Sequence, residues 1–212
     1  DKANLPLEVK YLAIVESALD PKAESYVGAK GLWQFMYPTA KMFGLEINNY
    51  VDERMSPVKS TKAAVAYLKQ LYGIFGNWDL ALAAYNSGPG NVSKAIRRSG
   101  GYTNYWNIRP YLPKETADYV PRFYAIMYLF EHAEAHNLGV SSARRTYFET
   151  DTIHIKETVS FEQLSKRLPL TEEQLSLLNP EYKLNLIPYQ ANQPHPLRLP
   201  KAAMGQFMSA EA

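Results

Sequence analysis

Glycine and proline divide the first 140 residues into short segments, and this punctuation constrains the fold more than any other feature. Between the breaks, apolar residues recur at helical spacing, and no alternation typical of strands occurs before residue 140. We expect helices at residues 5–20, 39–43, 57–75, 80–87, 91–99 and 113–136, with Asp79 capping the fourth. Such short helices differ from the long-helix pattern of a four-helix bundle.

The pattern changes after Gly139. Residues 152–156 and 197–199 alternate like strands, and between them Ser160 and Thr171 each begin a capping box that opens a short helix. We therefore predict a mainly α fold with two domains, an all-α domain at residues 1–140 and a linker with a small α+β (β-α-α-β) domain at residues 141–212. A domain this small has little core of its own, so we expect it to dock on its neighbour.

The first expected helix carries a carboxylate within its apolar stripe. Leu5, Val9, Leu12, Glu16 and Leu19 are spaced four, three, four and three residues apart, which places them on one helix face. Burial disfavours the carboxylate anion, so the pKa of Glu16 is expected to be raised, as a general acid near neutral pH requires. The spacing also allows a structural alternative, in which Glu16 reaches water near the helix end or pairs with an arginine.

No second carboxylate has a comparable apolar setting. Asp20 lies at the expected helix end, and Glu115 lies in a first helical turn, where the helix dipole favours a carboxylate. The run Asp52-Glu53-Arg54 is interpreted as solvated or structural. Glycosidases usually need two carboxylates, but one can act first as acid and then as base if the substrate supplies its own nucleophile.

Composition excludes several other classes of function. The chain has no cysteine, so disulfides and cysteine-ligated metals are excluded, and its net charge of +2 gives no argument for nucleic acid binding. No apolar run approaches the roughly 20 residues of a membrane span. His132 and His136 have metal-ligand spacing but lack the zinc-protease motif, so we predict no metal. The chain starts at Asp1 without an apolar leader, so any signal peptide or lipid anchor is expected outside it.

Four short motifs occur in order along the helical part. They are Glu16-Ser17, Gly31-Leu32-Trp33-Gln34, Ala84-Tyr85-Asn86, and Glu115-Thr116 followed by Tyr119. In order and spacing they resemble the motifs of lytic transglycosylases of glycoside hydrolase family 23, over about residues 5–137.

This resemblance implies a lysozyme-like fold and cleavage of the β-1,4 bond between N-acetylmuramic acid and N-acetylglucosamine in peptidoglycan. The sugar's own 6-hydroxyl would attack, giving 1,6-anhydromuramic acid, which fits the missing second carboxylate. The implied partners are peptidoglycan glycan strands, with no cofactor. The implied location is the periplasm or the periplasmic face of the outer membrane of a Gram-negative bacterium.

The resemblance also assigns roles to individual residues. Glu16 would protonate the leaving oxygen and then deprotonate the 6-hydroxyl, and Ser25 would hold the muramoyl acetamido group. The other expected substrate-binding residues, which line the cleft or steady Glu16, are Ser17, Gln34, Met36, Tyr85, Asn86 and Tyr119. Trp33 stands where many relatives have Met, and Tyr37-Pro38 replaces a common Met-Pro, which we expect to alter subsite shape.

Residues 150–200 resemble a degenerate LysM module, a small peptidoglycan- or chitin-binding unit. Leu178-Asn179-Pro180 and Leu199-Pro200 match its pattern, whereas Lys156-Glu157-Thr158 replaces the usual Gly-Asp-Thr, and residues 182–196 look like an insertion. For this module, sugar binding and a docking or spacing role are both open. For the whole chain, the alternatives are a goose-type lysozyme that uses water, and an inactive peptidoglycan-binding protein.

Overall fold

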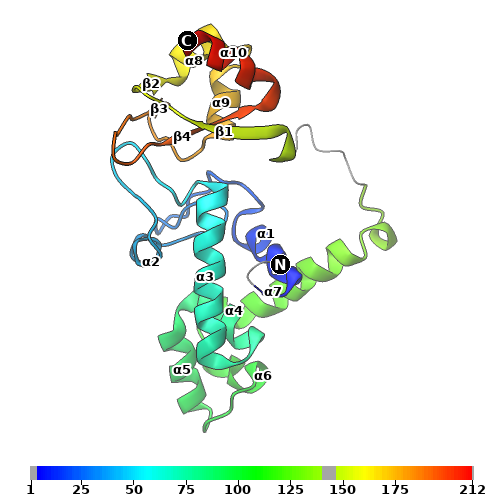
Figure 1. Cartoon of the computed structure of the whole chain (residues 1–212). Helices are drawn as coiled ribbons and strands as arrows, with labels where there is room; N and C mark the ends of the chain where they lie inside the picture. Colours follow the sequence, from blue (N-terminus) through cyan, green and yellow to red (C-terminus); the bar gives the residue numbers. More distant parts are fainter. Residues whose placement is uncertain (1–3, 140–146, 212) are drawn as a thin grey trace.

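The computed structural model describes residues 4–139 and 147–211. Figure 1 shows a helical part, coloured blue to green, beside a smaller part with strands and helices, coloured yellow to red. The predicted fold class, a mainly α part followed by a small α+β part, is confirmed. Within the described ranges, no helix has both the length and the apolar character needed to cross a membrane.

The helical part is built from helices that surround one buried helix. Its α-helices are α1 (Leu12–Ser17), α2 (Tyr37–Met42), α3 (Pro57–Phe75), α4 (Trp78–Ser87), α5 (Pro89–Arg98), α6 (Tyr105–Ile108) and α7 (Lys114–Glu131). Its 3-10 helices are η1 (Leu7–Tyr11), η2 (Arg109–Tyr111) and η3 (Glu134–His136). Helix α4 packs against α3, α5 and α7, and its residues 80–84 are all buried, as their continuous apolar run predicts.

Some helix boundaries differ from the sequence prediction. Asn77, and not Asp79, caps α4, because the Asn77 side chain accepts a hydrogen bond from the Leu80 N–H. Helix α5 begins at Pro89, whose fixed φ suits a first helical turn. Pro121 lies inside α7 without ending it.

The first helix is shorter than predicted. Residues 7–11 form a 3-10 turn, and α1 ends at Ser17 because Ala18 and Leu19 take left-handed backbone angles, with φ of 51° and 66°. The Leu19 N–H bonds to the Ala13 carbonyl across this turn. Leu19 is therefore 55% exposed and leaves the predicted stripe, and Glu16 lies in the last turn of α1.

The smaller part has two antiparallel strand pairs. Its elements are η4 (Tyr147–Glu149), β1 (Thr150–His154), β2 (Val159–Ser160), α8 (Phe161–Arg167), α9 (Glu172–Leu178), β3 (Leu186–Ile187), β4 (Pro196–Pro200) and α10 (Lys201–Glu211). Strand β1 pairs with β4, and β2 pairs with β3. Both predicted capping boxes are present, at Ser160 and Thr171. Helix α10 was not predicted. Its Ala203 and Phe207 pack in the hydrophobic core of the α+β part, which we call the second core.

The two parts dock through backbone pairing, as expected of a small core. Val51 belongs to the loop before α3, yet its side chain packs in the core of the α+β part. It forms a β-bridge with Tyr182, and the Asp52 N–H donates to the Glu181 carbonyl at 2.9 Å. The predicted boundary at residues 140–141 lies outside the described residues and stays a prediction.

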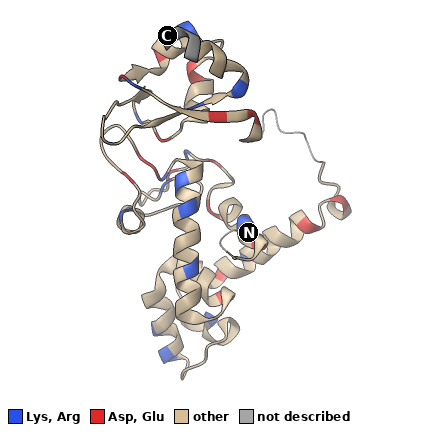
Figure 2. Cartoon of the chain, in the orientation of Figure 1, with Lys and Arg blue, Asp and Glu red and all other residues tan. Residues whose placement is uncertain are grey.

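Charged residues of both signs occur in both parts. In the view of Figure 2, lysine and arginine lie along α3 and at the end of α5, whereas acidic residues lie along α7 and in the α+β part. This mixture accords with the small net charge of +2. The electrostatics of the candidate site therefore depend on local burial and neighbours more than on the overall charge.

Candidate active site

Glu16 lies where the end of α1 meets α7. The hydroxyl of Tyr119, on α7, donates a short hydrogen bond to Oε1 of Glu16, and Tyr119 is only 2% exposed. Glu16 itself is half-buried, and within the described residues it forms no ion pair. The alternative in which an arginine neutralises Glu16 is therefore not what the structure has.

Burial sets the protonation of Glu16. Desolvation raises its pKa to about 7, against the lowering effect of the Tyr119 hydrogen bond. The negative charge of Glu115 contributes to this rise, and the positive charge of Arg122 opposes it. The raised pKa predicted from the apolar stripe is confirmed, and near neutral pH both protonation states of this carboxyl are populated.

Two tyrosines, the buried Tyr119 and the partly buried Tyr85, lie beside the carboxyl. Burial, followed by the charge of Glu16, raises the pKa of both Tyr85 and Tyr119 well above the usual value, so both hydroxyls stay neutral donors. The Tyr85 hydroxyl donates to the Trp33 carbonyl at 2.8 Å. Tyr85 thus joins α4 to the loop that contains the second sequence motif.

Ser17 makes a second connection to that loop. Its Oγ lies 3.0 Å from the Ala13 carbonyl and 3.0 Å from the Leu32 carbonyl. The hydroxyl therefore joins the end of α1 to the Gly31-Leu32-Trp33-Gln34 motif. In this structure Ser17 supports the position of the loop that follows Glu16.

We call residues 23–35 the site loop, since it contains both Ser25 and Gln34. The Gln34 amide donates to the carbonyls of Ala23 and Gly31, at 3.1 and 2.9 Å. Ser25 Oγ accepts from the Ala29 N–H at 3.0 Å. The side chains expected to bind substrate thus also close the loop on itself.

Gly31 is required by a close backbone approach. Its φ is +82°, and a Cβ added there would lie 1.9 Å from the Arg54 carbonyl oxygen. No side chain fits at this distance. The glycine of the second motif therefore lets the site loop lie directly against the segment that contains Arg54.

Arg54 anchors the same loop with its side chain. The guanidinium pairs with both oxygens of Asp52, at 2.9 and 2.7 Å, and donates to the carbonyls of Gly28 and Phe35, at 2.9 and 3.2 Å. Arg54 is 5% exposed, and Asp52 and Glu53 are also buried. Of the two interpretations of Asp52-Glu53-Arg54, the structural one is confirmed and the solvated one is wrong.

Asn86 lies at the end of α4 and faces the first turn of α7. Its Oδ1 accepts from the Thr116 hydroxyl at 2.8 Å, and its Nδ2 lies 3.5 Å from Glu115 Oε1. Thr116 is buried. The third and fourth motifs are therefore joined by this pair, and Glu115 is the carboxylate whose charge acts on Glu16.

Two positions differ from what the sequence suggested. Met36 is 42% exposed and precedes α2, so it lies at the rim of the site loop. Trp33 is 6% exposed and donates from Nε1 to the Thr61 hydroxyl on α3, at 2.9 Å. The Trp33 side chain therefore packs in the core, where it cannot shape a subsite directly, whereas Tyr37 is exposed.

The metal prediction concerns His132 and His136. Both rings pack against Tyr128, with centroids 4.6 and 5.5 Å from its ring. Among the described residues, no group of three or more His, Asp or Glu side chains is placed to hold a metal ion. These histidines therefore belong to an aromatic cluster at the end of α7.

Sequence reasoning missed Arg54 and Thr116 as supports of the site. The signal for Thr116 was its place in the fourth motif, next to Glu115. For Arg54 the signal was weaker: an arginine beside an acidic pair, shortly before a Ser-Pro helix start, with nothing local to show that it is buried.

Comparison with known families decides the kinship of this chain. A model described as "Transglycosylase SLT domain" matches residues 1–107, half of the chain. The chain belongs to the transglycosylase SLT domain family. A second model, "Lytic transglycosylase MltD, LysM-like domain", matches residues 149–212. The family and the LysM-like module predicted from the sequence motifs are thus confirmed.

Curated proteins similar to this chain include lytic murein transglycosylases. The chain is 31% identical over 215 residues to "Membrane-bound lytic murein transglycosylase D" of Escherichia coli (strain K12), covering 100% of this chain and 46% of the relative. It is 35% identical over 127 residues to "Soluble lytic murein transglycosylase" of Salmonella typhimurium, covering 57% of this chain and 20% of the relative. The chain spans about half the length or less of these relatives.

Solved structures show the same SLT fold. The crystal structure of the 70 kDa soluble lytic transglycosylase SLT70 from Escherichia coli matches with a TM-score of 0.51 and 31% identity, covering 68% of this chain and 25% of that one. The complex of the 70 kDa soluble lytic transglycosylase with bulgecin A matches with a TM-score of 0.53 and 28% identity, covering 68% and 25%.

Proposed function

We propose that this chain is a lytic transglycosylase that cleaves the β-1,4 bond between N-acetylmuramic acid and N-acetylglucosamine in peptidoglycan and forms 1,6-anhydromuramic acid. The observation that carries the proposal is the Glu16–Tyr119 pair, a half-buried carboxyl with a pKa of about 7 at the junction of α1 and α7. Relatives of the chain are named lytic murein transglycosylases, which supports the reaction class.

The reaction uses Glu16 twice. In its protonated form, Glu16 gives its proton to the glycosidic oxygen as the bond from the muramoyl C1 to that oxygen breaks. Glu16, now a carboxylate, takes the proton of the 6-hydroxyl, and the 6-oxygen forms a bond to C1. Atoms and charges balance without water. Because Tyr119 holds Oε1, Oε2 is the oxygen left for proton transfer.

The neighbouring residues have supporting roles in this proposal. Ser25 holds the muramoyl acetamido group, Gln34 contacts the sugar from the site loop, and Met36 contacts it from the rim of that loop. Asn86 contacts the sugar from α4, and Tyr85 fixes the loop through the Trp33 carbonyl. Ser17 maintains the spacing between Glu16 and the loop.

One solved relative supports the need for a glutamate. A crystal structure of lytic transglycosylase Slt from Pseudomonas aeruginosa is of an inactive Glu-to-Gln mutant, and it matches this chain with a TM-score of 0.51 and 26% identity. By analogy, we assign to Glu16 the part of the glutamate that is replaced in that inactive mutant.

The wider setting is also part of the proposal. We assign residues 1–140 to the catalytic domain and residues 141–212 to the linker and LysM-like domain. The site of action is the periplasm or the periplasmic face of the outer membrane of a Gram-negative bacterium, with a lipid anchor outside this chain. The relative named "membrane-bound" supports this location.

The test is a digest of purified murein with products read by mass spectrometry. Three chains are compared: the native chain, Glu16→Gln, and Glu8→Gln as a matched control, since Glu8 is exposed on the preceding turn. We expect anhydromuropeptides from the native chain and from Glu8→Gln, and none from Glu16→Gln.

Other outcomes point elsewhere. Reducing muramic acid ends would indicate a goose-type lysozyme that uses water. Equal products from the native chain and Glu16→Gln would mean that another residue is the acid. Binding to murein with no products from the native chain would indicate an inactive peptidoglycan-binding protein.

A further inference from the structure

The α+β part adds its backbone to a segment of the helical part. The Asp52 N–H donates to the Glu181 carbonyl, and the Lys183 N–H donates to the Tyr50 carbonyl, each at 2.9 Å. Between them Val51 is 1% exposed, with its side chain in the second core. Residues 50–52 and 181–183 are thus paired like two short strands around one buried anchor.

Arg54, two residues after Asp52, binds the site loop. Asp52 pairs with the Arg54 guanidinium, which binds the carbonyls of Gly28 and Phe35 in the site loop. A buried guanidinium with four such bonds is rigid, since any loss of a partner leaves a desolvated charge. One continuous path therefore runs from Glu181 through Asp52 and Arg54 to the site loop.

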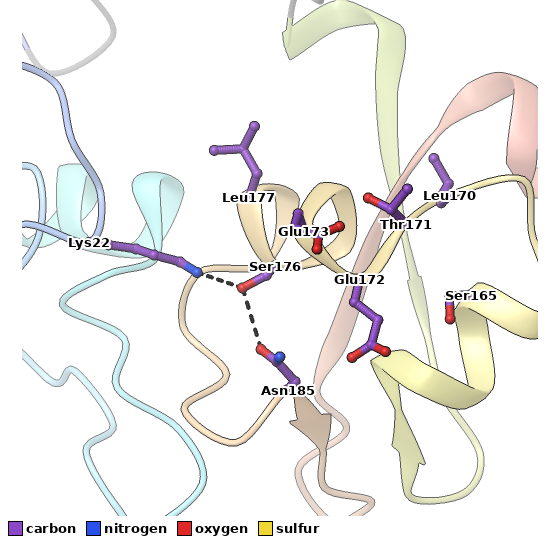
Figure 3. A pocket seen from close by; sticks show the side chains of 9 residues that line it. All are labelled: Lys22, Ser165, Leu170, Thr171, Glu172, Glu173, Ser176, Leu177 and Asn185. Carbon is purple, nitrogen blue, oxygen red and sulfur yellow. Dashed lines mark hydrogen bonds between the residues drawn. The ribbon is translucent and has the colours of Figure 1, made fainter.

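A second contact reaches the start of the same loop. Figure 3 shows the Lys22 side chain extending across a cavity of about 760 Å³ to Ser176 on α9. Lys22 Nζ lies 2.5 Å from Ser176 Oγ, which in turn lies 3.4 Å from Asn185 Oδ1. Lys22 directly precedes the site loop, so the α+β part contacts the residue before the loop as well as the segment that contains Asp52 and Arg54.

The other supports of the site loop come from the helices. Ser17 holds the Leu32 carbonyl, and Tyr85 holds the Trp33 carbonyl. These contacts lie in the second half of the loop. Gly28 lies in the first half with Ser25, and its carbonyl is held by the Arg54 guanidinium, which also binds the Phe35 carbonyl at the end of the loop and is itself paired with Asp52.

We propose that the α+β part braces the site loop through Val51, Asp52 and Arg54, and so positions Ser25 and Gln34 even for a glycan too short to reach the α+β part. Arg54 is then a positioning residue, and docking is a function of this module in addition to any glycan binding. The loop bracing stands on the contacts alone, whereas its effect on catalysis rests on the proposed function.

The first test reads the loop without using activity. Amide hydrogen exchange is measured in the full chain for the native protein, Val51→Asp and Arg54→Lys. Val51→Asp places a charge in the second core, and we expect exchange in residues 28–35 to rise by about tenfold, together with residues 181–183. Arg54→Lys loses the guanidinium fork, so residues 28–35 should exchange faster while residues 181–183 do not.

The matched control is Lys183→Ala. Its Nζ bonds the Asn48 carbonyl at the exposed rim of the same interface, but it has no contact with Arg54. Helix α4 serves as the internal reference in every variant. Faster exchange at residues 181–183 in Val51→Asp with unchanged exchange at residues 28–35 overturns the proposal, and so does unchanged exchange at both. General unfolding of Val51→Asp would raise exchange in α4 too. In that case, exchange at residues 28–35 in Arg54→Lys decides whether the loop is braced through Arg54.

The second test reads the kinetic consequence. On a soluble murein tetrasaccharide, Val51→Asp and Arg54→Lys should each raise KM about fivefold with kcat within about twofold, since substrate positioning is lost and the acid is unchanged. The pH dependence set by Glu16 should not move. The double variant should show less than the product of the single effects, because both act on one path.

The two tests separate the two claims. Multiplicative effects in the double variant, or an unchanged KM in Arg54→Lys, overturn positioning by the module. A chain that yields no products at all would refute the proposed function, whereas the exchange result would still decide whether the α+β part braces the loop.

Discussion

The carboxyl of Glu16 and the site loop are held by opposite kinds of interaction. Glu16 lies between two helices, where removal of water raises its pKa to about 7 and a single hydroxyl contacts it. The site loop has little regular structure and is fixed by a buried guanidinium, a glycine contact and hydrogen bonds to backbone carbonyls. The protonation of Glu16 depends on the exclusion of water, whereas the position of the site loop depends on hydrogen bonds to it.

This difference predicts different sensitivities. A change near Glu16 should mainly alter protonation, because apolar packing tolerates modest change. A change in the loop network should mainly alter geometry and stability, because a buried polar group without its partner is costly. The following four predictions test this contrast.

Gly31→Ala should have the largest effect. The new methyl would overlap the Arg54 carbonyl oxygen, and Gly31 has a φ of +82°, so we expect a loss of about 3–4 kcal/mol in the free energy of unfolding. Urea denaturation measures it. Gly28→Ala is the matched control, with a similar φ of +84° and open space around the added methyl, and should cost about 1 kcal/mol. Equal losses would show that the close contact is not what requires Gly31.

Glu16→Gln should stabilise the protein above neutral pH. The pKa of Glu16 is about 7 in the folded chain against an ordinary value of 4.5, so the native state binds the proton more tightly. Its stabilising contribution is complete below about pH 4.5 and is lost as the pH rises through about 7. At pH 8 we expect the variant to be about 2 kcal/mol more stable than the native chain, and at pH 4 about equal. Urea denaturation at both pH values measures this; equal stability at pH 8 would refute the desolvation of Glu16.

Tyr119→Phe should move the pH profile of activity. The Tyr119 hydrogen bond lowers the pKa of Glu16, so its loss should raise that pKa above 7. Because the acid works in its protonated form, kcat/KM should then fall at a higher pH than in the native chain. Tyr124→Phe is the control, since the Tyr124 hydroxyl on the same helix donates to Asp79 instead. A fall at the same pH in both variants would show that Tyr119 does not set the protonation of Glu16.

Thr171→Ala should have the smallest effect and should stay within the α+β part. It removes the side chain that caps α9, which costs about 1 kcal/mol. Hydrogen exchange should quicken in α9 and remain unchanged in α4. If α4 also exchanges faster, the two cores unfold together. The interactions that hold Glu16 and those that hold the site loop would then be less independent than the contacts indicate.

The sequence predicted those features that depend on neighbours along the chain. The spacing around Glu16 showed an apolar setting, and both capping boxes could be read from residues three apart. What the sequence did not predict depends on contacts between distant residues. The burial of Arg54 requires Gly28 and Phe35 to lie around it, and Trp33 is buried because Thr61 on α3 accepts its N–H.

The same limit applies to the end of the first helix. The stripe through Leu19 continued by periodicity, but left-handed angles at Ala18 and Leu19 end α1 early, and no glycine or asparagine marks that turn. The desolvation of Glu16 was predicted in spite of this, because its position relative to Val9 and Leu12 does not depend on where the helix ends. Local spacing was sufficient to predict the raised pKa of Glu16, but it did not predict the residues around it.

The hydrogen bond from Tyr119 to one oxygen of Glu16 has a consequence for how the proposed enzyme renews itself. With Oε1 occupied, the oxygen that released the proton is also the one that receives the next proton, from the 6-hydroxyl. Each cleavage then reprotonates Glu16 with the proton of the substrate's 6-hydroxyl, so the next bond can be cleaved without a proton from the buffer. Successive cuts along one strand would be independent of the buffering capacity of the medium around the cell wall.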